Sequence, residues 1–559
     1  MKRLCATIVI ALISIHSFAQ APNWQWAKSA GGTNNDQGNS IAVDAAGNTY
    51  ITGFFKGPTI TFGATTVSNN YNGSQDIFIT KYDANGNALW AKSAGGFDNE
   101  YVSGIAVDAS GNTYITGSFY GPTTTFGTTT LTNNGNCNIF VTKYDSNGNV
   151  IWAKSAGGTS YDNAHSIAVD AAGNAIITGY FGSSTITFGT TTLTNNGGGD
   201  ILIAKYDTNG NVVWAKSAGG TGSDTGSSIA LDAAGTATIT GYYFSDTITF
   251  GATTLISNSN IGGGDNIFIA KYDTNGNVIW AKSAGGTYYD NASSIAVDAA
   301  GNATITGSLA SPTVTFGTTT LTNNGIGTSD IFIAKYDTNG NALWAKSAGG
   351  TDEDLGSGVA IDATGNTYIT GRFQSPAITF GTTTLSKNGS NISTDIFIAK
   401  YDTNGNVVWA KSVGGTSYDD SYSIAIDAVG NAYITGYFKS PTITFGATTL
   451  TNAISTGSTT DFFIAKLDGT ITTGIAEMEN GETVLLAPNP FTSQLSISFN
   501  EAQKNTSIKL MNTLGECIQQ LTTSNQQLIL DMSSFARGMY FVQITDANKN
   551  VVNKKVIKE

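Results

Sequence analysis

The chain has 559 residues, more than one hydrophobic core normally serves, so we expect several domains or an array of repeats. Its formal net charge of −13 and its sparse basic residues argue against nucleic-acid binding, which needs clustered Lys and Arg. With only three cysteines, a disulfide-stapled scaffold is excluded, and stability has to come from packing.

Residues 1–20 have the pattern of a signal peptide. Lys2 and Arg3 precede an apolar run over residues 4–15, and small residues around Ala19 suit a cleavage site. The run is shorter than the roughly 20 residues that span a bilayer, and no later stretch is longer. We therefore expect an exported chain with no transmembrane segment.

A repeated motif, Trp-Ala-Lys-Ser-Ala-Gly-Gly, organises the next 450 residues or so. Its tryptophan recurs every 62 to 66 residues, at Trp26, Trp90, Trp152, Trp214, Trp280, Trp344 and Trp409. Each unit holds four principal segments rich in Ile, Val, Tyr, Phe and Thr, separated by Gly, Asn and Asp clusters typical of turns. No stretch has sustained helical periodicity, so the sequence predicts an all-β protein.

Seven such units in a closed ring correspond to a seven-bladed β-propeller over residues 21–468. A linear β-solenoid is the alternative, although its coils are usually much shorter. The seventh unit stops at Asp468 without its Trp-containing segment, and a spare copy stands near the start of the chain. We therefore predict that Trp24–Ala30 supplies the fourth strand of the seventh blade and closes the ring.

Each unit exceeds the roughly 40–50 residues usual for a propeller blade. The surplus is a Thr-rich segment, such as residues 58–67, followed by a variable Asn/Gly/Ser loop between the second and third strands. Strand direction places it on the same rim as the links between blades, here called the decorated rim. The tight Asp-x-x-Gly turns lie on the opposite, tight-turn rim. Because variable loops on a rigid scaffold commonly carry function, the decorated rim is the candidate binding surface.

An acidic residue precedes each inner strand by five positions. In a closed ring these residues would surround the channel mouth, where carboxylates suit a hard cation such as Ca²⁺ or a polyol. Alternatively, each caps its own loop through backbone N–H groups. The seven residues are Asp36, Glu100, Asp162, Asp224, Asp290, Asp354 and Asp419. No cofactor other than Ca²⁺ is indicated.

The chain has few residues of the types that commonly carry out catalysis. His165 is the single histidine after residue 20, and its position suggests a solvent-facing substitution. Arg372 is the single arginine of the repeat region, so an arginine cluster that grips phosphate cannot form there. We expect Lys205 and Lys216 to snorkel at a blade margin and the tryptophans to pack rather than stack on sugars. The chain is predicted not to be an enzyme, although glycosidase-like carboxylate pairs stay open.

The repeated series Ile-Ala-Val-Asp-Ala-x-Gly-Asn, Tyr-Ile-Thr-Gly and Asp-Ile-Phe-Ile-Ala-Lys-Tyr-Asp-x-Asn-Gly-Asn resembles the SBBP, or β-propeller, repeat of exported bacterial proteins. The match covers about residues 24–468. Thr236 and Leu467 depart from it locally. The resemblance implies the fold and brings no catalytic residues.

A different pattern follows a linker at residues 469–486. Residues 487–559 hold six short β-patterned segments, which suggests a small Ig-like β-sandwich. Their motifs resemble the type A sorting domain of the type IX (Por) secretion system of Bacteroidetes-type bacteria; an ordinary sandwich binding module is the alternative. The motif residues are Pro488, Asn489, Pro490, Gly515, Gly538, Tyr540, Lys555 and Lys558.

The sorting resemblance implies the type IX translocon and its sortase as partners, and surface lipopolysaccharide as an anchor. The protein would then lie at the cell surface or be released. We expect non-catalytic binding or adhesion through the decorated rim, with a glycan or a protein as ligand. A structural surface-layer component and a glycan-active hydrolase are the alternatives.

Overall fold

The computed structural model describes residues 21–71, 73–258, 264–325, 327–454, 456–469, 484–489, 491–499, 506–512, 516–545 and 551–558. The expected signal peptide and most of the expected linker lie outside these residues. The chain divides into two units, one formed by residues 23–469 and one containing the C-terminal strands. The described residues form strands and turns and no helix.

Within residues 23–469, six repeats each build four antiparallel strands in the order of the chain, and the last repeat takes its fourth strand from the start of the chain. The first of these sheets is extended to six strands by β10 (Thr123–Phe126) and β11 (Thr129–Thr132). The first strands are β2 (Asp36–Val43), β8 (Glu100–Val107), β14 (Asp162–Val169), β20 (Asp224–Leu231), β26 (Asp290–Val297), β32 (Asp354–Ile361) and β38 (Asp419–Ile426). The second strands are β3 (Thr49–Phe55), β9 (Thr113–Phe119), β15 (Ala175–Phe181), β21 (Ala237–Tyr243), β27 (Ala303–Leu309), β33 (Thr367–Phe373) and β39 (Ala432–Phe438).

The third strands are β6 (Asp76–Tyr82), β12 (Asn138–Tyr144), β18 (Asp200–Tyr206), β24 (Asn266–Tyr272), β30 (Asp330–Tyr336), β36 (Asp395–Tyr401) and β42 (Asp461–Leu467). The fourth strands are β7 (Ala88–Gly96), β13 (Val150–Ala156), β19 (Val212–Ala218), β25 (Val278–Ala284), β31 (Ala342–Ala348), β37 (Val407–Val413) and, at the chain's start, β1 (Trp24–Ala30).

Tight turns join first to second strands through one recurring device. In the first unit, Oδ1 of Asp44 accepts hydrogen bonds from the backbone N–H groups of Ala46 and Asn48 at 3.0 and 2.9 Å. Gly47 completes the turn with a φ of +80°, a region that glycine enters without steric cost. The Asp-x-x-Gly-Asn spacing, with Thr236 in place of the Asn in the fourth unit, therefore dictates these hairpins locally, as the sequence predicts.

Strand β1 supplies the missing strand of the last sheet, as the sequence predicts. It pairs antiparallel with β42, from Trp24 opposite Leu467 to Ala30 opposite Phe462. The Trp24 ring also packs edge-on against Phe445, with centroids 4.9 Å apart. Two segments more than 400 residues apart in sequence are thus joined in one sheet.

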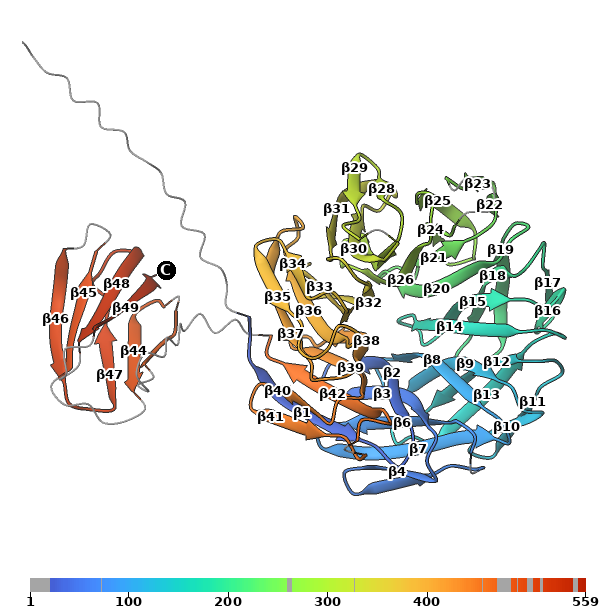
Figure 1. Cartoon of the computed structure of the whole chain (residues 1–559), viewed down its shortest axis with the longest axis horizontal. Coiled ribbons are helices and arrows are strands. Elements are labelled where there is room, and N and C mark those ends of the chain that lie inside the picture. The colour runs from blue at the N-terminus through green and yellow to red at the C-terminus, as the bar shows by residue number, and fades with distance from the viewer. Residues whose placement is uncertain are drawn as a thin grey trace, which may run out of the picture. The chain divides into compact units, whose positions relative to one another are not determined.

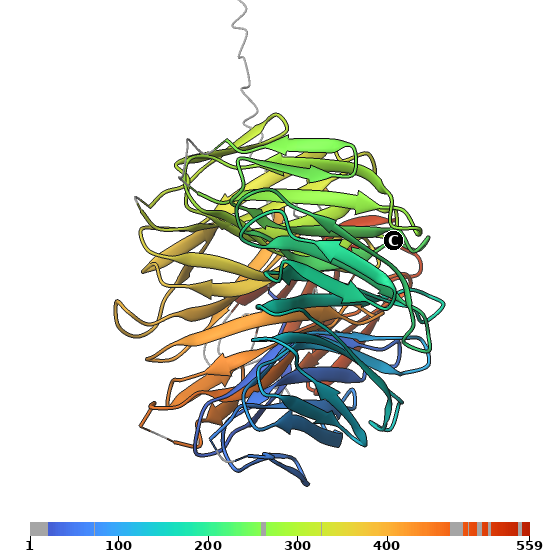
Figure 2. The same cartoon turned by 90° about the vertical axis from the view of Figure 1, so that its right-hand side faces the viewer.

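Neighbouring sheets contact one another in chain order through their first strands, and the series returns to its start because β2 contacts both β8 and β38. At this last junction the backbone N–H of Ile41 donates to Oγ of Ser423 at 3.3 Å. Figure 1 shows the sheets of residues 23–469 arranged around a common centre, and Figure 2 shows them edge-on.

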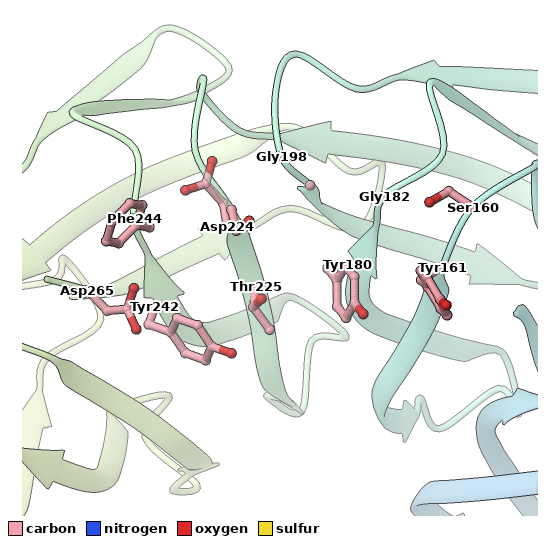
Figure 3. Close-up of a pocket in the computed structure, with 12 residues that line it drawn as sticks. Ser160, Tyr161, Tyr180, Gly182, Gly198, Asp224, Thr225, Tyr242, Phe244 and Asp265 are labelled. Atoms are coloured by element: carbon pink, nitrogen blue, oxygen red, sulfur yellow. The ribbon is translucent and has the colours of Figure 1, made fainter. Parts of the chain in front are cut away.

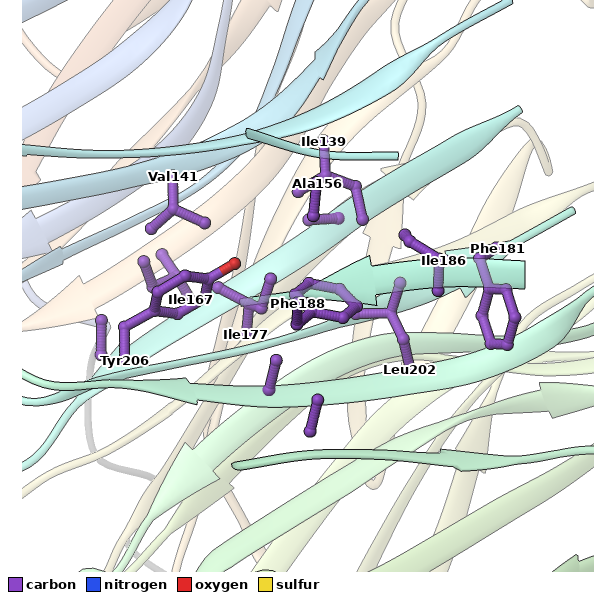
Figure 4. Close-up of a cluster of buried hydrophobic side chains, with 14 of the residues drawn as sticks. Ile139, Val141, Ala156, Ile167, Ile177, Phe181, Ile186, Phe188, Leu202 and Tyr206 are labelled. Atoms are coloured by element: carbon purple, nitrogen blue, oxygen red, sulfur yellow. The ribbon is translucent and has the colours of Figure 1, made fainter. Parts of the chain in front are cut away.

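The hydrophobic core lies between adjacent sheets. One such cluster joins Ile139 and Val141 of β12 to Ile177 of β15 and Leu202 of β18 (Figure 4). Third strands are apolar on both faces because each is covered by a sheet on either side, and all seven residues of β18 are buried. This explains the unbroken apolar runs in the sequence.

The Thr-rich segments are two-stranded hairpins and belong partly to the core, which the sequence reasoning missed by treating them as rim decoration. In the hairpin of β16 (Thr185–Phe188) and β17 (Thr191–Thr194), Phe188 is 1% exposed within the cluster of Figure 4. The other hairpins are β4 (Thr59–Phe62) with β5 (Thr65–Ser68), β10 (Thr123–Phe126) with β11 (Thr129–Thr132), β22 (Thr247–Phe250) with β23 (Thr253–Ile256), β28 (Thr313–Phe316) with β29 (Thr319–Thr322), β34 (Ala377–Phe380) with β35 (Thr383–Ser386), and β40 (Thr442–Phe445) with β41 (Thr448–Thr451).

The C-terminal unit has two antiparallel sheets that share one hydrophobic cluster. One sheet contains β43 (Val484–Ala487), β44 (Gln494–Phe499) and β47 (Gln527–Asp531). The other contains β45 (Thr506–Met511), β46 (Cys517–Thr523), β48 (Gly538–Thr545) and β49 (Val551–Lys558). The six predicted segments are all strands, and β43 begins within the segment expected to be a linker.

Candidate binding site on the decorated rim

The decorated rim contains the links between units and the ends of the Thr-rich hairpins, as predicted from strand direction. Nδ2 of Asn70, which follows the first hairpin, donates to the carbonyl of Gly95 in the following link at 3.1 Å. The backbone N–H of Asp36 donates across the ring junction to the carbonyl of Thr460 at 2.7 Å. The segments that vary most between repeats are therefore held together on one edge.

The seven acidic residues of the inner strands are fully buried at this rim, each at the start of a first strand. Most are bound within their own unit, as the capping alternative predicts. In the sixth unit, Asp354 accepts a hydrogen bond from the Gly350 N–H at 2.9 Å and one from the Ser375 hydroxyl at 2.7 Å. A serine occupies the same place beside Asp162, Asp224, Asp290 and Asp419.

Asp36 and Glu100 differ because glycine replaces that serine, as Gly57 in the first unit and Gly121 in the second. Among the described residues, Oδ1 of Asp36 and both carboxylate oxygens of Glu100 lack a hydrogen bond of normal geometry. Burial, reinforced by the charge of Asp461, raises the pKa of Asp36 to about 8. Burial, with the charge of Asp76 next, likewise raises the pKa of Glu100 to about 8.

These charge interactions pair a carboxylate at the start of a first strand with one at the start of the third strand of the preceding unit. They do not join all the acids around one shared centre. Asp200, for example, has its pKa raised to about 6 by burial and by the nearby charge of Asp224. Within the part of the chain that the structure describes, no group of three or more His, Cys, Asp or Glu side chains is placed to hold a metal ion. Binding of Ca²⁺ by the acidic residues stays a prediction.

Exposed aromatic side chains gather on the decorated rim. The eight that are most exposed in the described part of residues 23–469 all lie in its links and loops or at the strand ends beside them: Tyr71, Phe97, Tyr101, Tyr161, Phe244, Tyr288, Tyr289 and Tyr418. Two of them, Tyr71 and Phe97, pack against each other in a tilted arrangement with ring centroids 4.3 Å apart. Large aromatic surface left in water on one face makes that face the candidate contact surface.

A cavity of about 560 Å³ opens on this rim between the third and fourth units. In the view of Figure 3, Tyr242 and Asp265 lie to one side of Thr225, and Tyr180 and Tyr161 lie to the other. The lining also includes Phe244 and carries no Lys or Arg. Its volume is within the roughly 300–1,000 Å³ of ordinary small-molecule sites.

A missing side chain opens this cavity. The residue before the third strand reaches the next unit in several repeats: Nε2 of Gln75 donates to the carbonyl of Glu100 at 3.0 Å, and Oγ1 of Thr394 donates to the Asp420 carboxylate at 2.8 Å. In the third unit this position is Gly199, which lines the cavity together with Gly198. At this junction the glycine therefore leaves open the space that a side chain such as Gln75 or Thr394 occupies elsewhere.

The equivalent position at another junction carries different chemistry. Tyr180 and Tyr242 correspond by strand pairing to Arg372 in the sixth unit. The guanidinium of Arg372 donates hydrogen bonds to the carboxylates of Asp420 at 2.7 Å and Glu353 at 3.3 Å. Side chains at this one place thus vary from unit to unit.

The tight-turn rim is uniform by comparison. Each of six tryptophans donates its indole N–H to a carbonyl in the turn of the next unit, as Trp152 does to Thr208 at 3.0 Å. The predicted packing role of these tryptophans is therefore confirmed. Lys205 was wrongly expected to snorkel: it is buried and forms an ion pair with Asp170 at 3.0 Å, whereas Lys216 is exposed.

His165 lies along the inner strands rather than in solvent. Its Nδ1 is 3.2 Å from the carbonyl of Gly226 in the next unit, and burial lowers the pKa of the ring. Asn39 makes the corresponding contact from the first unit, to the carbonyl of Val102 at 2.7 Å. The position is a bridge between units, so the histidine is a structural variant of it.

Family models match both parts of the chain. A β-propeller repeat model, SBBP, matches residues 25–53 and 408–437, and a secretion system C-terminal sorting domain model, Por_Secre_tail, matches residues 486–559. The chain carries SBBP repeats and a Por sorting domain. This domain indicates export by type IX secretion to the cell surface or the extracellular space, and hence interaction with that machinery. No helix in the described residues is long and apolar enough to cross a membrane.

Several residues of the sorting motif hold the end of the chain. Oδ1 of Asn489 accepts from the backbone N–H of Ile557 at 2.8 Å, and the ammonium group of Lys558 donates to the carbonyls of Ser533 and Phe535. The Tyr540 hydroxyl donates to the carbonyl of Ala536 at 2.6 Å. Gly538 has a positive φ and Pro488 is exposed. Pro490, Gly515 and the side chain of Lys555 lie outside the described residues.

Some known proteins can be aligned with a large part of this chain. An uncharacterized WD repeat-containing protein of Acanthamoeba polyphaga mimivirus is 28% identical over 534 residues, covering 79% of this chain and 38% of that protein. A fungal alcohol oxidase of the AA5 family, solved in complex with copper, covers 96% of this chain and all of its own, with 12% identity and a TM-score of 0.38. The WD40 domain of Neurospora crassa Pan2 covers 61% of this chain and 93% of its own, with 9% identity and a TM-score of 0.30.

Proposed function

We propose that this SBBP protein is a non-catalytic binding protein, delivered by type IX secretion, that recognises saccharides through its decorated rim. Residues 21–468 would form a seven-bladed β-propeller closed by β1, and residues 487–559 an Ig-like β-sandwich that the secretion sortase removes. The propeller would then stay at the cell surface, attached to lipopolysaccharide, or be released.

The exposed aromatic side chains carry this proposal. They lie on the rim where the repeats differ, and the tight-turn rim of the described residues has none of comparable exposure. Aromatic rings offer a flat apolar face with little conformational entropy to lose, which suits the C–H faces of sugar rings. The single arginine of the repeat region is already paired, which disfavours strongly anionic ligands.

Two alternatives remain distinguishable from binding. A structural surface-layer component would self-assemble without a ligand, and a glycan-active hydrolase would turn over its substrate. The buried carboxylates of the first strands are engaged within their units or shielded from solvent, which favours binding over hydrolysis.

A glycan array tests the proposal. The purified protein should bind a defined group of saccharides, and replacing Tyr161, Tyr242 and Phe244 together by Ala should remove that binding. The matched control is Val429→Ala, which alters an exposed apolar side chain on the tight-turn rim and should leave binding unchanged. Absence of saccharide binding, or equal loss in the control, would contradict the proposal.

A further inference from the structure

We propose that the cavity between the third and fourth units binds an amine-bearing saccharide, with the ammonium group paired to the carboxylate of Asp265. This inference rests on the proposed saccharide-binding function and assigns it a site and a ligand class. The cavity combines aromatic walls with the carboxylate of Asp265, which forms no ion pair among the described residues.

The acidic side of the cavity lacks a cation. Asp265 and Asp224 both line it, and no ion pair in the described residues includes either carboxylate. Asp224 is saturated, because the Ser245 hydroxyl and the Gly220 N–H donate to its Oδ2 at 2.7 and 2.8 Å. The Asn291 amide, with its nitrogen turned inward, reaches Oδ2 of Asp265 at 3.3 Å and brings no charge.

Asp265 is therefore the available counter-ion for a ligand. It is half-buried beside an aromatic wall, where a charge-assisted hydrogen bond is worth more than at an open surface. The charges of Asp224 and Asp290 would also be partly neutralised by a bound cation. A carboxylate-bearing sugar would meet Asp224 and Asp265 in a lining that has no basic side chain, so acidic saccharides are disfavoured.

The aromatic walls suit the rest of such a ligand. Tyr180 and Tyr242 come from the second strands of adjacent units, and Phe244 and Tyr161 stand at the mouth, 40% and 47% exposed. Rings so placed can cover sugar faces and also attract an ammonium group through their π-electrons. Hydroxyls of Ser160, Ser223 and Thr225 supply neutral hydrogen-bonding groups for the sugar hydroxyls.

The pH dependence of binding follows from the acids around the site. Burial, then the charges of Asp224 and Asp290, raises the pKa of Asp265 to about 6. Its carboxylate is therefore ionised at pH 7.5 and largely protonated at pH 5. Affinity for the amine-bearing ligand should fall between pH 7.5 and pH 5, because the carboxylate loses its charge while the sugar amine only becomes more fully protonated.

Calorimetry with short saccharides tests this. The probes are glucosamine disaccharide, its N-acetylated form and cellobiose, at pH 7.5 and pH 5, with purified full-length protein. We expect the glucosamine disaccharide to bind best, to lose about tenfold in affinity or more in Asp265→Asn, and to weaken at pH 5. Asp98→Asn, which removes an exposed acid from the rim of another unit, should bind like the unaltered protein.

The outcomes separate this inference from the proposed function. Equal binding of cellobiose and the glucosamine disaccharide, or binding that Asp265→Asn leaves unchanged, would overturn the amine site while leaving saccharide recognition intact. Absence of binding by every saccharide here and on the array would overturn both.

Discussion

Replacing Gly57 with Ser should stabilise the protein by completing an interaction that five other units already have. The added hydroxyl would donate to Asp36, as the Ser375 hydroxyl donates to Asp354 at 2.7 Å. A Cβ at Gly57 would meet no atom nearer than 3.5 Å, the carbonyl oxygen of Thr59, and its φ is not in the positive region. The substitution therefore fits without strain.

The expected gain in the free energy of unfolding follows from the hydrogen bond that the Asp36 carboxylate now lacks. A hydrogen bond to a charged group contributes about 1.5–3 kcal/mol, and glycine removal contributes about 0.4–1 kcal/mol through the unfolded chain. Burial of the new hydroxyl offsets part of this, so we expect about 1–3 kcal/mol. For a unit of this size that corresponds to a rise in Tm of about 1–3 °C, from an unfolding entropy of about 2.1 cal/mol/K per residue.

The gain should also depend on pH. The new donor should lower the pKa of Asp36 from about 8 towards the value of about 6 that Asp354 and Asp419 have beside their serines. The difference in stability between the Ser and Gly proteins should therefore grow as pH rises from 6 to 8. Calorimetric melts across this range measure it, with Gly57→Ala as the control that adds a Cβ without a hydroxyl. Equal melting of the Ser and Ala variants at pH 8.5 would refute the reasoning.

Three further predictions follow from the same structure. Removing residues 21–32 should lower Tm sharply and promote aggregation, because β42 keeps β39 but loses β1, its other partner, along six residue pairs. A synthetic 21–32 peptide should restore Tm, whereas a scrambled peptide should not. Phe188→Ala should lower the free energy of unfolding by about 3–5 kcal/mol in denaturant titrations, because its ring is buried. Thr187→Ala, on the exposed face of the same strand, should be nearly neutral. Equal effects of the two substitutions would contradict a core role for the hairpin. Stability should fall as pH rises from about 4 to about 8, because Asp36 and Glu100 bind protons more tightly in the folded than in the unfolded protein. The double variant Asp36→Asn with Glu100→Gln should flatten this pH dependence in thermal melts. An unchanged slope would contradict the raised pKa values.

Features that recur once per unit could be predicted from the sequence, because each repeat constrains the others. A missing Trp strand after Asp468 and a spare copy at Trp24–Ala30 were enough to predict the pairing of β1 with β42. The turn role of each Asp-x-x-Gly-Asn segment was equally local. The burial of the Thr-rich hairpins was missed, although the alternation of Ile186 and Phe188 with Thr carried the signal of a half-buried strand.

The candidate site depends on contacts between residues that are distant in sequence, which the motifs of a single strand or turn do not reveal. The serine that binds five of the inner acids lies 21 residues later, so the missing hydrogen bonds of the buried Asp36 and Glu100 reflect Gly57 and Gly121 at that distant position. The cavity likewise depends on the absence of a side chain at Gly199 and on rings from two units. Lys205 was misplaced for a related reason, since its partner Asp170 is distant in sequence, in the turn between β14 and β15.

Hydrogen–deuterium exchange with and without a bound saccharide tests the central claim most directly. Recognition through the decorated rim predicts slower exchange in its links and loops near the aromatic cavity, residues 158–163, 197–200, 221–225 and 243–246. The tight turns, such as residues 207–211, should exchange at the same rate in both states. Protection confined to those turns or to the fourth strands, with the decorated rim unchanged, would contradict the account.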